Sequence, residues 1–150
     1  MVNYQQKFRL DDKIAYIVGG LGLIGSEVSM AIASAGAKTI ILDVDNKRAN
    51  TFLVGMAKIS PVVFELFDCT KLDELEKNFS DIISKHANPN IFVNCSYPRT
   101  KDWGGAVGSS FEDISFDSFR ENVDIHMNSY AWLAKICLLY TSPSPRDKRQ

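Results

Sequence analysis

The sequence lacks the features that mark several classes of protein. Its 150 residues contain no apolar run that approaches a membrane span, and the N-terminus lacks the layout of a signal peptide. The formal net charge of −1 gives no strong attraction for nucleic acid or for a membrane surface. The three cysteines, Cys69, Cys95 and Cys137, have neither metal-ligand nor disulfide spacing. We therefore expect no metal, no nucleic-acid or membrane partner, and a reducing, cytoplasmic setting.

One glycine-rich stretch joins a short apolar run to a helix-like pattern. Residues 18–25 read VGGLGLIG, which fits G-x-G-x-x-G from Gly20 and G-x-x-G-x-x-G from Gly19. In a dinucleotide site such glycines allow a sharp turn, close approach of the backbone to a pyrophosphate, and close packing of helix on strand. The free N–H groups at the helix start would face the phosphates. The alternative interpretation is a tight strand–helix turn that holds no ligand.

An acid follows this turn at the spacing of a ribose-binding residue. Asp43 ends the next apolar run 18 residues after Gly25, close to the expected spacing of about 20. Its carboxylate could accept hydrogen bonds from both ribose hydroxyls of NAD and would repel the 2′-phosphate of NADP. Since Lys47 and Arg48 come only after the turn, we expect NAD rather than NADP. The alternative is that Asp43 only begins the turn.

Strand-like and helix-like patterns alternate along the whole chain. This alternation favours a parallel sheet with right-handed crossovers. We predict a truncated Rossmann-type, doubly wound α/β fold with about four strands in the order 3-2-1-4 and helices on both faces. After a loose polar arm at 1–12, strands are expected at 13–19, 38–43, 62–67 and 91–94, and helices at 23–35, from Asn46, from a Thr70–Asp73 capping box, and from Ser115.

Apolar spacing assigns an apolar face to each predicted helix, which for the second helix carries Ala49, Phe52, Leu53 and Met56. For the first helix this face is Ile24, Val28, Ile32 and Ala35, and for the third it is Leu72, Leu75, Phe79, Ile82 and Ile83. For the last helix it is Phe116, Phe119, Val123, Met127, Tyr130 and Leu133.

Ligands of such sheets lie along the carboxyl ends of the strands. The predicted cofactor site therefore combines the glycine turn with the residues that end the other three strands. Its members are Gly19, Leu21, Gly22, Leu23, Ile24, Gly25, Asp43, Asp68, Cys69, Asn94, Cys95 and Ser96.

Taken together, these motifs resemble the N-terminal half of a short-chain dehydrogenase/reductase over about residues 11–136. The glycine turn is similar to the family's T-G-G-x-x-x-I-G, Phe67–Thr70 resembles its D-V-T, and Asn94–Tyr97 stands where N-N-A-G usually does. The resemblance implies an NAD-dependent oxidoreductase that moves hydride to or from an alcohol or carbonyl substrate. It also implies that Asp68 meets the adenine and that the segment from Asn94 lies beside the nicotinamide.

The departures from the family pattern affect the catalytic groups. His126 stands where the family's catalytic Asn would fall, seven residues after Phe119. An imidazole could hold the proton-relay water as that Asn does, or it could simply pack beside Val123 and Tyr130. The family's Ser and Tyr-x-x-x-Lys lie beyond this helix, and we expect them to be absent. Since general acid–base catalysis contributes roughly 10²–10⁴-fold, we expect an inactive chain.

Two other interpretations of the glycine turn stay open. One is a non-catalytic dinucleotide-binding or regulatory module. The other is a nucleotide-sugar epimerase or dehydratase of the extended branch, which Gly19-x-x-Gly22-x-x-Gly25 also fits. Fold alone does not separate these functions.

Two further segments carry resemblances of their own. The loop 97–103 with residues 113–126 resembles oxidoreductases that act on flagellin-modifying, sialic-acid-like sugars, so Arg99 and Lys101 would suit an anionic sugar unless the loop is simply solvated. We expect a small-molecule substrate and a homo-oligomeric full-length parent. Residues 137–147 resemble a translated sequencing adapter. We therefore expect one domain over 1–136 and an artefactual or disordered tail over 137–150.

Overall fold

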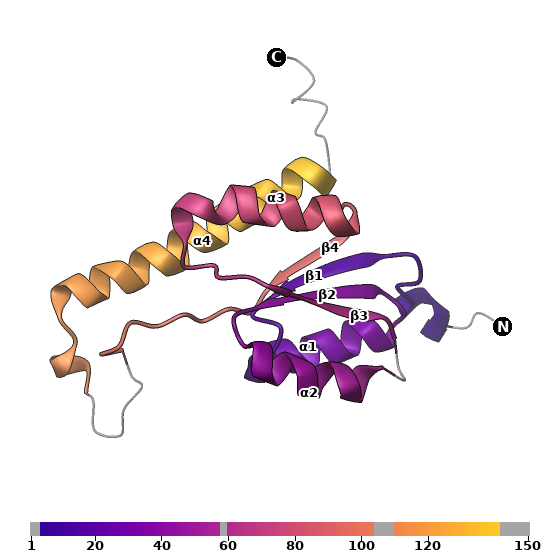
Figure 1. Ribbon diagram of the computed structural model, residues 1–150, viewed down its shortest axis with the longest axis horizontal. Helices are drawn as coiled ribbons and strands as arrows, with labels where there is room; N and C mark the ends of the chain where they lie inside the picture. Colours follow the sequence, from indigo (N-terminus) through magenta and orange to yellow (C-terminus); the bar gives the residue numbers. More distant parts are fainter. Residues whose placement is uncertain (1–3, 58–59, 104–109, 142–150) are drawn as a thin grey trace, which may run out of the picture.

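Four parallel strands form the sheet in the computed structural model, which describes residues 4–57, 60–103 and 110–141 (Figure 1). The strands are β1 (Ile14–Val18), β2 (Lys38–Asp43), β3 (Val62–Leu66) and β4 (Ile91–Asn94). Their order is β3-β2-β1-β4, which confirms the predicted order. In this register Ile17 of β1 lies opposite Ile41 of β2 and Val93 of β4. The carboxyl ends of β1, β2 and β4 therefore meet at one edge.

Helices cover both faces of the sheet, which confirms the doubly wound α/β fold. Helices α1 (Leu23–Ser34) and α2 (Asn46–Met56) lie on one face, and α3 (Leu75–His86) and α4 (Phe116–Thr141) on the other (Figure 1). Short 3₁₀ turns occur at Tyr4–Phe8, Leu72–Glu74 and Phe111–Asp113.

The two central strands are buried because they are apolar on both faces. Tyr16 and Ile40 face the cluster built with α3 and α4, whereas Ile41 faces Leu21 and Ala49 on the α2 side. The predicted inner face of α3 is confirmed, since Leu75, Phe79, Ile82 and Ile83 are buried and Leu72 packs against them.

The predicted buried faces of the first and last helices are only partly right, since Leu133 is buried in the core while other predicted residues are exposed. In α1 the residues against the sheet are small (Gly25, Ser29 and Ala33), and they let the helix approach closely while Ile24 stays 69% exposed. In α4 the predicted apolar residues Phe116, Phe119, Val123 and Met127 are exposed. The first half of α4 extends beyond the sheet (Figure 1) and turns polar residues inward instead, among them Ser118 and Asn122.

The helix starts differ from prediction at two places. Asp45, not Asn46, caps α2 by accepting a 2.9 Å hydrogen bond from the Arg48 amide. The Thr70–Asp73 capping box does not form, because the amide and hydroxyl of Thr70 both donate to Asp68. Ser115 does accept from the Ser118 amide, as predicted.

At its other end α4 continues to Thr141, so the first five residues of the predicted tail are helical. Cys137 is buried. Residues 142–150 lie outside the described residues.

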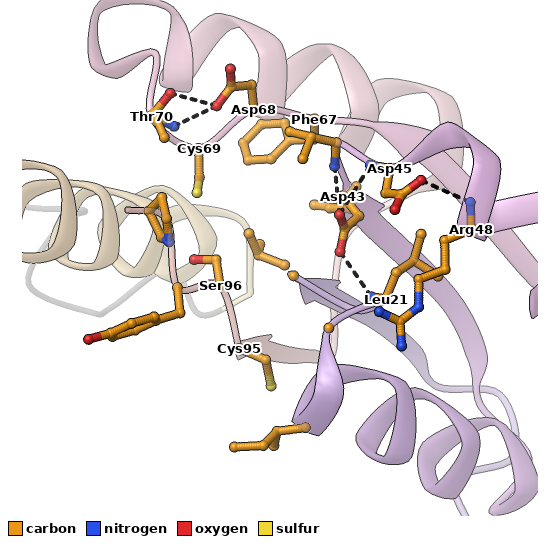
Figure 2. Close-up of a pocket in the computed structure, with 18 of the residues that line it drawn as sticks. Leu21, Asp43, Asp45, Arg48, Phe67, Asp68, Cys69, Thr70, Cys95 and Ser96 are labelled. Atoms are coloured by element: carbon orange, nitrogen blue, oxygen red, sulfur yellow. Dashed lines mark hydrogen bonds between the residues drawn. The ribbon is translucent and has the colours of Figure 1, made fainter. Parts of the chain in front are cut away.

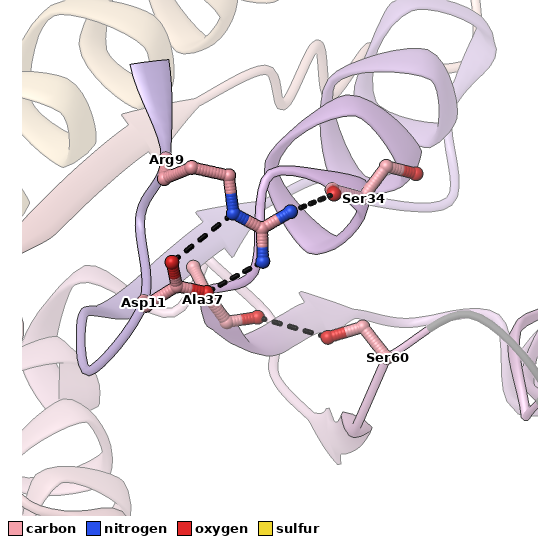
Figure 3. Close-up of polar contacts among 5 residues, drawn as sticks. All are labelled: Arg9, Asp11, Ser34, Ala37 and Ser60. Atoms are coloured by element: carbon pink, nitrogen blue, oxygen red, sulfur yellow. Dashed lines mark hydrogen bonds and ion pairs between the residues drawn. The ribbon is translucent and has the colours of Figure 1, made fainter. Parts of the chain in front are cut away.

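The last residues of the N-terminal arm form hydrogen bonds with the end of α1 (Figure 3), so they are not loose as predicted. The Arg9 guanidinium pairs with Asp11 and donates to the carbonyl of Ser34 at 3.4 Å. The Leu10 amide donates to the Ala35 carbonyl at 2.8 Å. A cation at the C-terminal end of a helix also complements the helix dipole. Residues 1–3 lie outside the described residues.

Ala87 adopts a backbone conformation that glycine strongly prefers. It follows α3 with φ 79° and ψ 171°, a region that costs a residue with a Cβ on the order of 1–3 kcal/mol. The Tyr16 hydroxyl donates to the Ala87 carbonyl at 2.7 Å. Burial raises the pKa of Tyr16 to about 12, so this hydroxyl stays a donor. The contact between β1 and the end of α3 thus holds Ala87 in place.

We expect Ala87→Gly to stabilise the chain by about 1 kcal/mol, because relief of the strain exceeds the extra chain entropy of glycine. The measurement is urea unfolding followed by circular dichroism. The matched control is Ala57→Gly at the end of α2, where φ is −54° and glycine should cost about 0.5–1 kcal/mol. Equal losses at both positions would contradict the strain at Ala87.

Candidate functional site

A pocket of about 820 Å³ lies at the carboxyl edge of the sheet, within the usual size range of small-molecule sites. The glycine turn and the loops after β2, β3 and β4 form its wall (Figure 2). Ten of the twelve predicted site residues line it, namely Gly19, Leu21, Gly22, Leu23, Ile24, Asp43, Asp68, Cys69, Cys95 and Ser96. Gly25 and Asn94 are not among the lining residues.

Two glycines of the turn, Gly19 and Gly25, each have a separate geometric reason to be glycine. Gly19 has φ +69°, and a Cβ there would lie 2.6 Å from the backbone of Ser96. A Cβ on Gly25 would lie 2.0 Å from the Gly19 carbonyl oxygen. These two positions allow the start of α1 and the end of β4 to pack against the turn.

Gly22 differs because its backbone conformation does not require glycine. Its φ of −65° and ψ of 177° suit any residue, and a Cβ there would have only the Gly19 carbonyl oxygen, at 3.2 Å, as a neighbour within 4 Å. Among the described residues no side chain caps the start of α1. The amides of the first helical turn have no partner within the helix and carry the positive end of its dipole. This start of α1 is therefore suited to an anion such as a diphosphate.

Asp43 joins the end of β2 to the glycine turn. One carboxylate oxygen accepts from the Leu21 amide at 2.9 Å, and the other accepts from the amides of Val44 and Asp45 at 2.8 and 3.2 Å. Asp43 therefore begins the turn, as the alternative interpretation held, and its carboxylate also lines the pocket. A carboxylate has about four acceptor sites, so these three bonds leave room for about one more donor.

The end of β3 contributes an acid and a thiol. Asp68 accepts from the amide and the hydroxyl of Thr70, at 3.0 and 2.7 Å, and so fixes the turn that follows. Cys69 lies beside Ser96 (Figure 2), and burial is the main cause that raises the pKa of its thiol. The loops after β3 and β4 therefore approach each other across the pocket.

The end of β4 is held by the Asn94 side chain. Its carbonyl oxygen accepts from the Ser96 amide at 3.0 Å and from the Ser96 hydroxyl at 2.6 Å. Its amide nitrogen is buried and has no hydrogen-bond partner among the described residues. Cys95 is half-buried, and burial raises the pKa of its thiol.

Arg48 is a pocket residue that the sequence prediction missed. The expectation that no arginine lies near Asp43 is wrong, because Arg48 lines the same pocket wall (Figure 2). The turn capped by Asp45 brings the first turn of α2 back over the end of β2. An arginine in the first turn of the helix that follows the acid was the available signal.

His126 lies behind the loop that follows β4. Its Nε2 is 2.8 Å from the carbonyl oxygen of Pro98, which can only accept, so this nitrogen donates. The ring packs 4.7 Å from the ring of Tyr97 and 5.7 Å from that of Tyr130. His126 is not among the residues that line the pocket.

The spacing Tyr-x-x-x-Lys does occur in the chain, at Tyr97 and Lys101, where the sequence prediction expected none. Both residues lie in the loop after β4, with Pro98 between them, and not on a helix. Four residues bring two side chains to one face of a helix but not of an extended loop. Tyr97 lines the pocket and Lys101 does not.

Two other features are absent from residues 4–57, 60–103 and 110–141. No helix there combines the length and hydrophobicity needed to cross a bilayer. No three His, Cys, Asp or Glu side chains of this described part gather as a metal site would require.

The chain belongs to the short-chain dehydrogenase family, whose model matches residues 13–144. It is 28% identical over 129 residues to 7alpha-hydroxysteroid dehydrogenase of Escherichia coli, an alignment that covers 85% of this chain and 48% of that protein. It is 25% identical over 124 residues to post-translational flagellin modification protein A of Campylobacter coli, covering 81% of this chain and 47% of that protein.

A solved structure shares the fold. The complex of 7alpha-hydroxysteroid dehydrogenase with NADH and 7-oxo glycochenodeoxycholic acid superposes with a TM-score of 0.73 at 24% identity, covering 93% of this chain and 52% of that one. The chain thus spans about half the length, or less, of the relatives it matches.

Proposed function

We propose that this chain is the cofactor-binding part of an NAD(P)-dependent oxidoreductase that transfers hydride to or from an alcohol or carbonyl substrate. The observation that carries the proposal is the uncapped start of α1, which faces the pocket at Gly22 with the Asp43 carboxylate beside it. The bound NADH of the related hydroxysteroid dehydrogenase structure supports a nicotinamide dinucleotide. Hydride chemistry would belong to the cofactor, and this chain's residues would bind and orient it.

The roles of the pocket residues follow from their positions. The amides at the start of α1, including Leu23 and Ile24, would hold the diphosphate. The remaining acceptor site of Asp43 would take one ribose hydroxyl, so we propose one such bond where the sequence suggested two. Asp68 and Cys69 would lie at the adenine, and the segment from Asn94 to Ser96 would lie along the nicotinamide half.

The catalytic proton would need a group outside this pocket wall. In the proposal His126 holds a relay water only through Nδ1, since its Nε2 donates to Pro98. Tyr97 and Lys101 lack the helical placement that would let them act together. We therefore propose that the chain as given is inactive.

We further propose a sugar that bears an anionic group as the substrate, with Arg99 in the pocket wall as support. The exposed apolar face of α4, built from Phe116, Phe119, Val123 and Met127, supports the proposal of a homo-oligomer. A cytoplasmic location stays a prediction.

Gly22→Ala tests the dinucleotide proposal. The φ and ψ of residue 22 allow alanine, whose methyl group would make a tight 3.2 Å contact with the Gly19 carbonyl oxygen and would occupy the approach to the helix amides. We expect the Kd for NADH, measured by fluorescence titration, to rise about 10- to 100-fold, as loss of charge-assisted hydrogen bonds would cause. The control is Gly55→Ala, where nothing lies within 4 Å of the new Cβ. An unchanged Kd in a folded Gly22→Ala variant would refute the site.

Arg48→Ala tests the cofactor preference. We propose that Asp43 favours NAD, while Arg48 gives a 2′-phosphate a partner and so narrows that preference. We expect removal of Arg48 to weaken NADPH about tenfold and to leave NADH within about twofold. Lys47→Ala makes the same charge change at a neighbouring exposed residue outside the pocket lining and should alter neither affinity. A constant NADPH-to-NADH ratio in Arg48→Ala would rule out this role.

A further inference from the structure

The loop after β4 alternates between sheltered and exposed residues although it pairs with no strand in the described part of the chain. Ser96 is buried and Pro98, Thr100 and Asp102 are half-buried, whereas Tyr97, Arg99 and Lys101 are exposed. Such a period of two indicates extended backbone with one covered side. The extended part reaches Thr100, where a turn begins, since the Trp103 amide donates to the Thr100 carbonyl at 3.2 Å. The covering element is α4.

Four residues of α4, spaced one turn apart, contact the four sheltered residues in reverse order. The Ser118 hydroxyl donates to the Asp102 carboxylate. The Asn122 side chain accepts from the Thr100 amide at 3.3 Å and donates to the Thr100 hydroxyl.

The other two contacts end on carbonyl oxygens of the loop. Nε2 of His126 donates to the Pro98 carbonyl at 2.8 Å. The Tyr130 hydroxyl donates to the Ser96 carbonyl. From Tyr130 to Asn122, each step of four residues along α4 thus matches a step of two residues back along the loop. Ser118 bonds both Thr100 and Asp102, where the loop turns.

The two spacings match because of backbone geometry. Four residues of α-helix advance about 6 Å, and two residues of extended chain advance about 6.5 Å. A helix can therefore bond every second residue of an antiparallel extended segment over a few turns. Its side chains here take the place of a neighbouring strand.

This arrangement explains two features of α4 that apolar periodicity did not predict. Ser118 and Asn122 are 9% and 2% exposed although both are polar, and buried polar groups must be bonded. Their partners are loop groups, so the inward face of this part of α4 is polar.

We infer that Ser118, Asn122, His126 and Tyr130 are positioning residues that act as one ladder and fix the loop from Ser96 to Asp102 as a preformed wall of the pocket. Ser96, Tyr97, Pro98 and Arg99 line that pocket. In the sheet order β2-β1-β4 this wall lies across the glycine turn from Asp43. On the proposed function, ADP would occupy the Asp43 side and the turn, and the rest of NADH would reach the ladder wall.

The test compares Tyr130→Phe, which removes one hydroxyl from the ladder, with Tyr140→Phe. Tyr140 lies on the same helix, and its hydroxyl bonds Ser80, far from the loop. We expect Tyr130→Phe to raise the Kd for NADH about 2- to 10-fold while the Kd for ADP stays within about twofold. The Thr100 amide bonds Asn122, which lies two ladder residues before Tyr130 on α4. Hydrogen exchange of this amide should also quicken at least about twofold. Tyr140→Phe should change none of these.

Thr100→Val is the second variant. It removes the Thr100 hydroxyl, which accepts from Asn122, and leaves the residues of α4 unchanged. It should reproduce the selective loss of NADH affinity if Tyr130→Phe fails to fold. The inference is overturned if Thr100 exchange in Tyr130→Phe equals that in Tyr140→Phe, or if NADH and ADP weaken equally. If neither nucleotide binds the unaltered chain, the proposed function fails. The hydrogen-exchange rates of Thr100 then determine by themselves whether the four α4 residues act as one ladder.

Discussion

The close approach of Gly25 to Gly19 is the constraint on which the rest of the structure depends. With the Gly19 carbonyl oxygen 2.0 Å from where a Cβ of residue 25 would stand, α1 can begin directly against the end of β1. That contact aims the start of the helix at the carboxyl edge of the sheet. Gly19, in turn, touches the backbone of Ser96 and so sets the distance to β4. The pocket lies beside this contact between the glycine turn, the start of α1 and the end of β4.

The sequence predicted what depends on local pattern and on general rules of chain topology. Residues 38–43 and 91–94 are strands within the predicted bounds because apolar runs between turn residues leave few alternatives. The glycine turn and the position of Asp43 were enough to predict the strand order, and strand ends then pointed to most of the pocket wall.

The largest miss, on α4, depends on a partner distant in the sequence. Apolar spacing predicted that the face of α4 with Phe116 and Met127 is buried, because these residues are more hydrophobic than Ser118 and Asn122. In the structure the face with Ser118 and Asn122 is buried instead. Hydrophobicity cannot reveal that a polar loop, and not a sheet, covers that part of the helix. Arg48 was missed for a different, local reason, since the turn capped by Asp45 brings it to the same pocket wall as Asp43.

Two parts of the chain therefore support the pocket in different ways. At the contact between Gly19 and Gly25, the absence of side chains lets backbone segments pack closely. On α4, the side chains of the ladder form hydrogen bonds to the loop after β4. The first depends on close packing of backbone atoms, and the second depends on hydrogen bonds that single substitutions can remove.

The central claim, that a dinucleotide lies against the start of α1, is tested most directly by following backbone amide resonances while NAD is added to the ¹⁵N-labelled chain. The account predicts that the largest shifts fall on the amides of Gly22, Leu23 and Ile24, with smaller shifts at Asp43 and Ser96. Shifts confined to the exposed face of α4, or none at a saturating concentration of NAD, would contradict it.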